Sequence, residues 1–551
     1  MPEAVLAGVQ TLTVVVDSLC LDCFHVFPEF HQFQAQVPVH PSSFQTKQSQ
    51  LTYAGQHLCA RDDAFYLLQF KKGLTVVDQN IHDCDNETRA KTLSWNVTGD
   101  CCQWDGVTCN GFTGHVIGLD LSCSILNQTI NANSSLTKLG HLQRLNLAFS
   151  QFDDDFPLGL SELSSLTHLN LSNTGFNEGE IQIPPGLSKL VSLDLSSNDF
   201  QVGRTTSRSL LQNLTNLEVL LLDSVDAPFE LPKNFPSSLR YLILQDTNMC
   251  GNISDSQFFH LPNLQVLRMG WNPLLTGTLP NFNWSFSTSI LELDFFYTDI
   301  FGKVPDSIGN LHSLWYLDLS LNRLSGLIPV SVGNLSGIRV LTLSSNSFTG
   351  NVPSTISKLN KLVDLDLSFN DFQGSILESI GNLTAITKLT LSGNNFTGNV
   401  PSTIKKLKTL NYLTLSFNNF ESSIPDNFAN FSEPSFLYLQ TNNFTGPLPY
   451  LIATLTRLQE LNLQNNLLTG PLPSNLSRLQ ELETLDFSFN YFNGTIPPWL
   501  FRLPSLVSLS IQYNELTGKL PNELKSITLA TLELIFGTTS CMEKSLIGYY
   551  L

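Results

Sequence analysis

The chain has 551 residues, of which 42% are hydrophobic and 14% charged, and its formal net charge at pH 7 is -18. This acidic balance argues against nucleic acid and anionic membrane surfaces as partners, because proteins bind both through clusters of lysine and arginine side chains. It would steer a basic ligand favourably, although acidity also serves simple solubility. A chain of this length would ordinarily form several domains unless it is built from repeats.

The N-terminal stretch, residues 1–56, matches nothing downstream and is predicted to be an irregular extension. Within it, residues 4–16 have the length of the apolar part of a signal peptide, but Glu3 and Asp17 flank them and the first basic residue is Lys47. This segment therefore resembles a signal peptide poorly. No stretch of the sequence reaches the roughly 18–20 apolar residues of a membrane span.

A short amphipathic helix is predicted within residues 62–73, ahead of Gly73. Phe65, Leu67 and Leu68 are expected along one face, acidic residues open the segment, and Lys71 and Lys72 close it. Gly73 is expected to follow the helix as a stop signal.

From Leu119 onward a repeat of the form L-x-x-L-x-L-x-x-N-x-(F/L)-x-G-x-(I/V/L)-P takes over. Its asparagine recurs every 24 residues, at Asn322, Asn346, Asn370, Asn394, Asn418, Asn442, Asn466, Asn490 and Asn514. Earlier copies are looser: Asn198 and Asn272 are kept, while Ser150, Thr174, Val225, Thr247 and Thr298 replace the asparagine. The last predicted strand, around residues 532–534, lacks the asparagine and leads into a tail without a recognisable closing cap.

The unit predicts a leucine-rich-repeat solenoid: a curved superhelix with a parallel β-sheet on its concave face and short 3-10 or β segments on its convex face. Alternation in x-L-x-L-x directs the leucines inward and their neighbours outward. The recurring asparagine can satisfy backbone groups of neighbouring coils through its side-chain amide. The Gly-x-(I/V/L)-Pro segment gives a bend followed by an extended piece, since glycine permits unusual dihedrals and proline fixes one.

Residues outside the generic repeat carry a resemblance to one family. The repeat variant at residues 326–329, 350–353 and 398–401 has glycine before (I/V/L)-Pro, and Cys101-Cys102-Gln-Trp104 lies in the segment before the repeats. Together with Leu93-Ser-Trp95, this resembles plant leucine-rich-repeat receptor-like proteins, particularly the tomato Cf type, over about residues 57–530. The chain looks like a truncated member, since later repeats, a closing cap and a membrane anchor of the family pattern are not found.

The resemblance implies residues 57–115 as a helical, disulfide-bonded N-terminal cap, residues 116–535 as about 18 repeats and residues 536–551 as a divergent tail. It also implies three disulfides in the cap, namely Cys59–Cys101, Cys102–Cys109 and Cys84–Cys123, although counting alone allows fifteen pairings. A zinc site in this cluster is disfavoured, because paired C-x-x-C knuckles are missing. Cys250 and Cys541 are expected unpaired.

A separate C-x-x-C pair, Cys20 and Cys23 with His25 and His31 nearby, is treated as incidental, since one pair on an irregular stretch is a weak metal signal. No metal and no cofactor are therefore expected.

Sequons of the form N-x-(S/T) are abundant and indicate a glycosylated secretory route, although asparagine-rich repeats also produce sequons by chance. The predicted glycosylation positions are Asn86, Asn96, Asn127, Asn133, Asn213, Asn252, Asn283, Asn334, Asn382, Asn395, Asn430, Asn443, Asn475 and Asn493. Asn170 also lies in a sequon, but within a predicted strand where it is expected to be shielded.

The sequence carries none of the common catalytic or nucleotide-binding motifs, and Asp371-Phe-Gln-Gly is not accompanied by the other kinase motifs. Asp318 and Asp366 share one strand column but have no accompanying base or nucleophile, so we expect no enzymatic activity. Outward strand positions suit protein or peptide recognition instead. The ligand-binding candidates are Arg268, Trp271, Asp294, Tyr297, Tyr316, Asp318, Asp364, Asp366, Phe369, Lys388, Tyr412, Phe417, Tyr438, Gln440, Glu460 and Gln464, followed by Phe489 and Tyr513.

The resemblance implies non-enzymatic recognition of a microbial protein or peptide in plant immunity, with signalling through a partner receptor kinase. It places the family at the plasma membrane and this chain, as given, outside the cell. Three alternatives remain: a secreted inhibitor of a microbial cell-wall-degrading enzyme, as in polygalacturonase-inhibiting proteins, a developmental peptide receptor, and a nonfunctional truncated paralogue.

Overall fold

A computed structural model describes residues 58–76, 84, 91–124, 126, 127, 130, 133–150, 157–175, 179, 181, 185–203, 206, 214–281, 289–426, 428, 431, 434–517 and 533–535. These residues all belong to one compact unit that begins at His57. The predicted N-terminal extension and the predicted divergent tail lie outside them.

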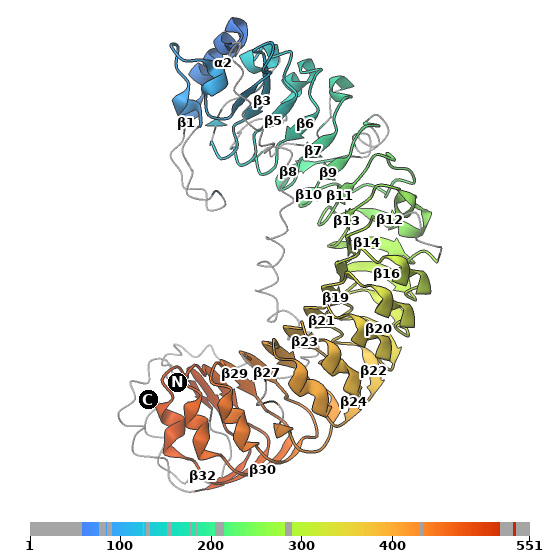
Figure 1. Cartoon of the computed structure of the whole chain (residues 1–551), viewed down its shortest axis with the longest axis vertical. Coiled ribbons are helices and arrows are strands. Elements are labelled where there is room, and N and C mark those ends of the chain that lie inside the picture. Colours follow the sequence, from blue (N-terminus) through green and yellow to red (C-terminus); the bar gives the residue numbers. More distant parts are fainter. Residues whose placement is uncertain are drawn as a thin grey trace, which may run out of the picture. The chain divides into compact units, whose positions relative to one another are not determined.

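The described unit is a stack of coils, each of which contributes one short strand to a long main sheet (Figure 1). The strands are β2 (Val107–Cys109), β3 (Val116–Asp120), β5 (Arg144–Asn146), β6 (His168–Asn170), β7 (Ser192–Asp194), β9 (Val219–Leu221), β11 (Tyr241–Ile243), β13 (Val266–Arg268), β15 (Glu292–Asp294), β17 (Tyr316–Asp318), β19 (Val340–Thr342), β21 (Asp364–Asp366), β23 (Lys388–Thr390), β25 (Tyr412–Thr414), β27 (Phe436–Tyr438), β29 (Glu460–Asn462), β31 (Thr484–Asp486), β33 (Ser508–Ser510) and β35 (Glu533–Ile535). From β3 onward each strand pairs in parallel with the strand of the next coil, and β2 pairs antiparallel with β3.

A second set of strands follows the bend of each coil. It consists of β8 (Asn198–Gln201) with β10 (Val225–Asp226), then β12 (Cys250–Asn252), β14 (Asn272–Gly277), β16 (Thr298–Gly302), β18 (Arg323–Gly326), β20 (Ser347–Gly350), β22 (Asp371–Gly374), β24 (Asn395–Gly398) and β26 (Asn419–Phe420), and finally β28 (Thr445–Pro447), β30 (Leu467–Pro471), β32 (Tyr491–Thr495) and β34 (Glu515–Thr517). In these strands Gly326 adopts φ 82°, the left-handed region that glycine reaches without a Cβ penalty. The bend predicted from Gly-x-(I/V/L)-Pro is therefore present.

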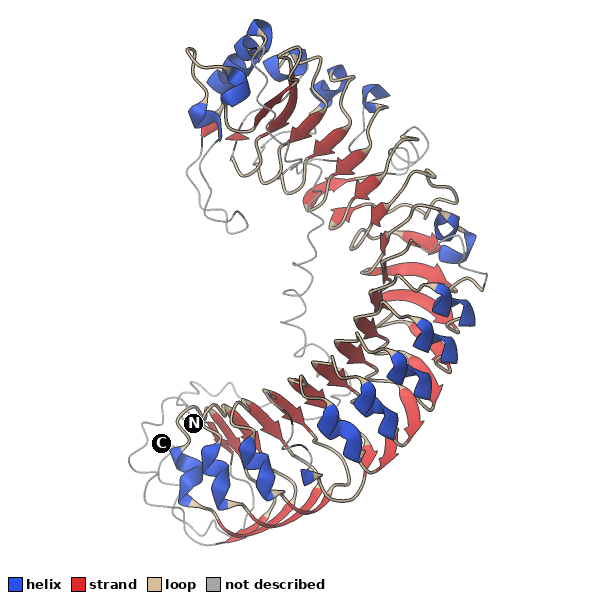
Figure 2. Ribbon diagram, in the orientation of Figure 1, coloured by secondary structure: helices blue, strands red, loops and turns tan. Residues whose placement is uncertain are grey.

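Short 3-10 helices lie on the side of the coils opposite the main sheet (Figure 2). They are η3 (Ser135–Lys138), η4 (Leu158–Glu162), η5 (Pro185–Leu187), η6 (Ile253–Asp255), η7 (Phe258–His260), η9 (Asp306–Asn310), η10 (Val330–Asn334), η11 (Ser354–Lys358), η12 (Glu378–Asn382), η13 (Ser402–Lys406), η15 (Tyr450–Thr454), η16 (Ser474–Arg478) and η17 (Pro498–Arg502). The predicted combination of a parallel sheet on one face and 3-10 segments on the other is thus confirmed.

The core runs continuously between these layers. The repeat leucines are buried, as Leu317 and Leu319 illustrate, and so is the phenylalanine or leucine two residues after each ladder asparagine from Asn322 to Asn514. The rings of Phe348, Phe372 and Phe396 stack at 6.1 and 6.2 Å between centroids, so neighbouring coils share one apolar column. Because one strand cannot bury a face alone, every coil depends on its neighbours for this burial.

The asparagine ladder joins coils by side-chain hydrogen bonds. Asn418 donates to the carbonyl of Leu391 in the preceding coil at 2.9 Å and accepts from the amide of Phe396 at 3.0 Å. It also donates to Leu415 and Ser416 in its own coil. Each buried amide therefore satisfies backbone groups of two coils, which is the role that the sequence predicted for it.

The cap before the repeats contains α2 (Arg61–Gly73), β1 (Thr75–Val76), η1 (Lys91–Ser94) and η2 (Cys101–Gln103), and β1 pairs antiparallel with β4 (Leu126–Asn127), which follows the first repeat strand. The helix is present, but its expected face is wrong: Phe65 is exposed, and the buried residues are Asp63, Leu67 and Phe70. Gly73 is the last helical residue and not the residue after the helix. The Asp63 carboxylate accepts from the Val116 amide at 2.8 Å, so an acidic residue ties the helix to the first repeat strand.

Three disulfides cross-link the cap region: Cys59–Cys101, Cys84–Cys123 and Cys102–Cys109. These are the pairs that the resemblance implies. Four of these sulfurs lie within 4.8 Å of one another, but each is bonded to another sulfur and is not available as a metal ligand. Among the described residues Cys250 is unpaired, as expected, whereas Cys541 lies outside them.

In the part of the chain that the structure describes, no helix combines the length and apolarity required to cross a bilayer.

Candidate ligand-binding face

The outward side chains of the main sheet form three columns that run from coil to coil. The first column holds the residue that opens each strand, the second column holds the residue that closes it, and the edge column holds the residue before the ladder asparagine. On β17 these are Tyr316, Asp318 and Leu321. Since neighbouring strands pair without slippage here, residues of one column lie directly opposite each other.

The edge column carries the most exposed aromatic side chains of this face. Trp271, Tyr297, Phe369 and Phe417 are 40–44% exposed, and Phe489 and Tyr513 are similarly open. Trp271 packs edge-on against Tyr297 at 5.2 Å between ring centroids. All six adopt a left-handed φ between 50° and 57°, which costs a non-glycine residue about 1 kcal/mol. These candidates are therefore exposed, as predicted, and they stand on a strained turn of the backbone.

The second column differs from its prediction. Asp294, Asp318 and Asp366 were expected to face a ligand, but they are only 2%, 3% and 8% exposed. Each carboxylate accepts from the amide two residues further on, at 2.8 to 2.9 Å, which closes the turn after the strand. Alternation along a strand gives the direction of a side chain and not its exposure, so the sequence could not reveal this burial.

Other members of these columns are half-buried and paired. Lys388 lies over the ring of Tyr412 at 5.6 Å, and its Nζ lies 3.9 Å from Asp364 Oδ2. The Tyr438 hydroxyl donates to Glu460 at 2.6 Å. Gln440 and Gln464 stand in the turns after their strands and are half-buried.

Arg268 is bound to a residue that the sequence reasoning missed. Its guanidinium donates through Nε and Nη2 to one oxygen of Glu292, at 2.9 and 2.6 Å, and Glu292 is 3% exposed. Glu292 opens β15 and so belongs to the first column, where the same alternation rule would have found it. Because Arg268 already compensates this buried carboxylate, it is less free for a ligand than predicted.

Burial shapes the electrostatics of the middle of this face. It raises the pKa of Asp294 to about 7, with a further contribution from the Asp318 carboxylate. It also raises the pKa of Asp364 to about 7, against the opposing effect of the Lys388 ammonium. The pKa of the Tyr316 hydroxyl is raised by burial and by the Asp318 and Asp294 carboxylates. The face therefore holds carboxylates that ionise reluctantly and that a cation would favour in their charged form.

Predicted glycosylation positions avoid the main-sheet face wherever the structure describes them. Exposed asparagines occupy the ends of η10 and η12, the start of β24 and other positions outside the main-sheet strands. They are Asn96, Asn133, Asn252, Asn334, Asn382, Asn395, Asn443 and Asn493, whereas Asn475 is half-buried and donates to the Tyr450 carbonyl. Asn170 in β6 is half-buried and accepts from the Ser172 amide at 2.8 Å. Asn86, Asn127, Asn213, Asn283 and Asn430 have side chains outside the described residues.

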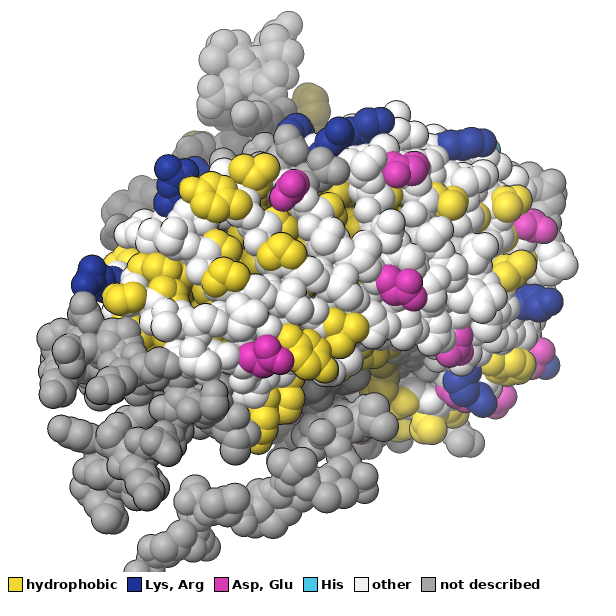
Figure 3. All heavy atoms as spheres, turned by 90° about the horizontal axis from the view of Figure 1, so that it is seen from below, with side chains coloured by type: hydrophobic (Ala, Val, Ile, Leu, Met, Phe, Trp, Pro, Cys, Tyr) yellow, Lys and Arg dark blue, Asp and Glu magenta, His cyan; other side chains and the backbone are white. Residues whose placement is uncertain are grey.

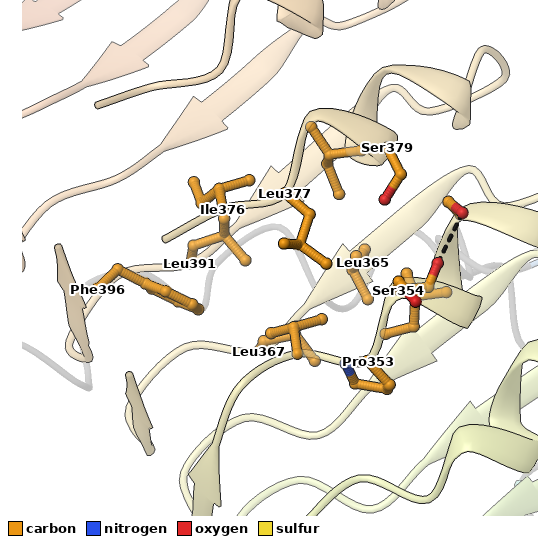
Figure 4. Close-up of a pocket in the computed structure, with 13 residues that line it drawn as sticks. Pro353, Ser354, Leu365, Leu367, Ile376, Leu377, Ser379, Leu391 and Phe396 are labelled. Atoms are coloured by element: carbon orange, nitrogen blue, oxygen red, sulfur yellow. Dashed lines mark hydrogen bonds between the residues drawn. The ribbon is translucent and has the colours of Figure 1, made fainter. Parts of the chain in front are cut away.

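A pocket lies between the coils of η11 and η12 (Figure 4). Its lining is apolar apart from serine hydroxyls, and it includes Ile376, Leu377, Leu391 and Phe396. Leu377 stands where the preceding coil has Pro353. No charged side chain lines this pocket, so it offers no chemistry, and we interpret it as a packing gap. In the view of Figure 3, charged side chains are likewise sparse among polar and hydrophobic ones.

Comparison with known families agrees with this architecture. A leucine rich repeat N-terminal domain matches residues 60–110, and leucine rich repeat families match residues 312–372, 385–407, 409–431 and 456–516. Receptor-like protein Cf-9 of Solanum pimpinellifolium is 36% identical over 274 residues, which is 47% of this chain and 31% of that protein. Receptor-like protein 6 of Arabidopsis thaliana is 34% identical over 282 residues, which is 48% of this chain and 28% of that protein.

The chain is built from leucine-rich repeats, and over about half of its length it is similar to plant receptor-like proteins. The aligned stretches span less than a third of the length of these receptor-like relatives. Among solved structures, the ectodomain of the Arabidopsis receptor kinase HAESA with its peptide hormone ligand IDA is 27% identical at a TM-score of 0.66. That match covers 86% of this chain and 88% of the ectodomain. The plant peptide hormone receptor RGFR1 in complex with RGF2 is 26% identical at a TM-score of 0.61, covering 74% and 76% of the two chains.

Proposed function

We propose that this chain belongs to a receptor-like protein that recognises a microbial protein or peptide at the main-sheet face, without catalysis, and that acts in plant immunity. The observation that carries the proposal is the edge column: a row of exposed aromatic side chains beside a strip of charged and hydroxyl-bearing strand residues. Aromatic side chains supply large contact area at low entropic cost, and they dominate the energetics of protein interfaces.

The relatives support the same use of the fold. Cf-9 and its homologues are receptor-like proteins, and the HAESA ectodomain is known in complex with a peptide hormone and the co-receptor SERK1. By analogy, we propose that this chain acts outside the cell, at the plasma membrane in its family setting, and signals through a partner receptor kinase. Receptor ectodomains of this kind are in general non-enzymatic.

The positions of the predicted glycans favour the same face. A glycan is bulky and excludes a partner from its surroundings. The exposed sequons described above lie in the cap, on or just before the 3-10 helices, and in or just before the second set of strands, and they leave the edge column open.

A block exchange between relatives tests the proposal. In the full chain, the outward residues of the three columns from β15 to β25 are replaced by those of Cf-9, and the defence response of leaf tissue to a panel of microbial culture filtrates is compared with the response that Cf-9 gives. We expect the response to follow the exchanged columns. A matched block that exchanges the exposed residues of η9 to η13 serves as the control. Response that follows the control block would place recognition on the opposite face and refute the proposal.

A second candidate is recognition of an endogenous peptide hormone. It is favoured by the similarity to HAESA and RGFR1, both solved with peptide hormones. The two candidates differ in the source of the ligand, so fractionated plant extract and microbial culture filtrate, applied to the same full chain, separate them.

A further inference from the structure

The middle of the main-sheet face holds a group of acidic and hydroxyl-bearing side chains that we call the acidic patch. It consists of Asp318 on β17, Thr342 on β19, Asp364 and Asp366 on β21, and Thr390 on β23. Asp318, Thr342, Asp366 and Thr390 follow one another in the second column, strand by strand. Asp364 stands in the first column between Val340 and Lys388. Neighbouring strands lie about 4.8 Å apart, so these side chains form one continuous strip.

Acidic side chains outnumber basic side chains in this strip. The patch holds three carboxylates, and the cation beside it, Lys388, lies at one side with its Nζ 3.9 Å from Asp364 Oδ2 and its ammonium over the Tyr412 ring. Toward β17 the intervening strand offers Val340 and Thr342, which carry no charge. Burying a carboxylate without a counter-charge is costly, because the low-dielectric surroundings solvate the ion poorly.

Two buried oxygen atoms of the patch have no hydrogen-bond partner within the described chain. They are Asp364 Oδ1 and Thr390 Oγ1, and Thr390 as a whole is 7% exposed. The Asp364 side chain as a whole is 22% exposed, so solvent and ligands reach part of it. Most buried polar atoms in proteins have a hydrogen-bond partner, so a polar group of a ligand beside these two atoms would complete their bonding.

The turn geometry does not explain the charge. Asp366 accepts from the Ser368 amide to close its turn, but Asn462 performs the same task on β29 by accepting from the Gln464 amide at 3.0 Å. The turn therefore requires an oxygen atom and not a negative charge. Asp364 opens its strand and makes no turn bond among those found, so its carboxylate has no folding role of this kind.

We infer that the acidic patch is the subsite for a basic side chain, lysine or arginine, of the recognised protein or peptide. The inference rests on the proposed function, because it names the chemistry of the ligand at the same face. The ammonium or guanidinium donates hydrogen bonds to Asp364 and Asp366, and the resulting charge-assisted bonds are stronger than neutral ones. Phe369, exposed at the edge of the same coil, offers its ring to the stem or the charge of that side chain.

The test uses the full chain and a displayed library of random 12-residue peptides, selected in 0.3 M salt so that the net charge of -18 is screened. Selected peptides are synthesised and their affinity is measured by calorimetry. We expect them to contain a lysine or arginine whose replacement by glutamine weakens binding about tenfold. The double substitution Asp364→Asn and Asp366→Asn should cause a similar loss, and combining both changes should add little further.

A matched control removes the same charge elsewhere. Asp371→Asn with Glu421→Gln neutralises two exposed acids outside the main sheet, and it should leave the affinity unchanged. Because Asn462 shows that an amide closes this turn, the Asp366→Asn change should keep the fold, which circular dichroism verifies.

The outcomes separate the inference from the proposed function. Peptides without enriched basic residues, or binding unchanged by Asp364→Asn with Asp366→Asn, would overturn the inference while leaving the face as the binding surface. The selected peptides are also tested on a chain with Phe369→Ala and Phe417→Ala. If neither this pair nor the patch substitutions weaken binding relative to the unchanged chain, the proposed function itself is refuted. If calcium ions bind to the chain without any peptide, and if the patch substitutions abolish this binding, the patch is a metal site. That result would also overturn the inference.

Discussion

Removing one rung of the asparagine ladder tests the origin of cohesion between coils. In Asn418→Ala, the chain loses four side-chain hydrogen bonds, to the carbonyls of Leu391, Leu415 and Ser416 and from the amide of Phe396. Each of the three carbonyls keeps a second donor, from the Asn394 and Asn442 amides and from the Gly393 N–H. The Phe396 amide therefore carries the larger share of the penalty.

The magnitude follows from these partners. An unsatisfied buried amide costs about 1–3 kcal/mol, and each further bond whose acceptor stays satisfied contributes about 1 kcal/mol or less. We expect a total loss of about 3–5 kcal/mol in local stability. Asn418→Thr should lose less, because Thr247 at the same ladder position still donates to the Leu244 carbonyl of its own coil at 3.0 Å.

Hydrogen exchange read by mass spectrometry over residues 391–420 measures the effect, because each coil contacts only its neighbours and opens locally. The control is Asn419→Ala, an exposed asparagine one residue away, which should change stability by less than about 0.5 kcal/mol. Equal loss of protection in the two alanine variants would refute the assignment of inter-coil cohesion to the ladder.

Three further predictions follow from the same structure. Burial raises the folded-state pKa of Asp364 to about 7 from an ordinary 3.8, so the folded state binds more protons between these values and its stability should fall as pH rises from 5 to 8. In urea unfolding, Asp364→Asn should reduce this fall, and the share of Asp364 between pH 5 and 8 is at most about 3 kcal/mol. Phe396→Ala removes a fully buried ring from the stacked column and should cost about 3–5 kcal/mol, measured by the same exchange experiment, whereas an effect below about 1 kcal/mol would contradict the packing. Replacing the pair Cys59–Cys101 by serines should destabilise the cap by about 4 kcal/mol, and replacing Cys102–Cys109 should destabilise it by about 2.5 kcal/mol. The first disulfide costs more to lose because its cysteines are 42 residues apart in sequence, whereas those of the second are 7 apart. The rate of proteolysis of the cap in the two variants checks this order.

The sequence predicted the features that depend on spacing. The 24-residue period placed Leu317 and Leu319 in the core and Asn418 in the ladder, because each feature is repeated many times and the repeats agree. Features set by tertiary surroundings were harder to predict. Periodicity alone chose Phe65 for the buried face of the cap helix, whereas the first repeat strand selects Asp63 through its amide.

The same distinction separates the three columns of the ligand-binding face. The edge aromatics are exposed as predicted, because their turn projects them away from neighbouring strands. Asp318 was also assigned an outward position, but the Tyr316 hydroxyl and the Ser320 amide both bind its carboxylate and cover it. The outward position of Glu292 was predictable, but the residue was missed. Its importance lies in the ion pair with Arg268 on the neighbouring strand, which the sequence alone does not reveal.

The strict 24-residue spacing from Asn322 to Asn514 has a consequence for how such a surface changes over generations. Every coil in this interval presents the same ladder contacts to the coil before it and the coil after it. A recombination event that removes or duplicates one whole coil therefore joins compatible ends, and the core remains continuous. What changes is the order of the outward residues along the main-sheet face. Specificity can thus be rearranged in steps of one coil without first losing the ability to fold.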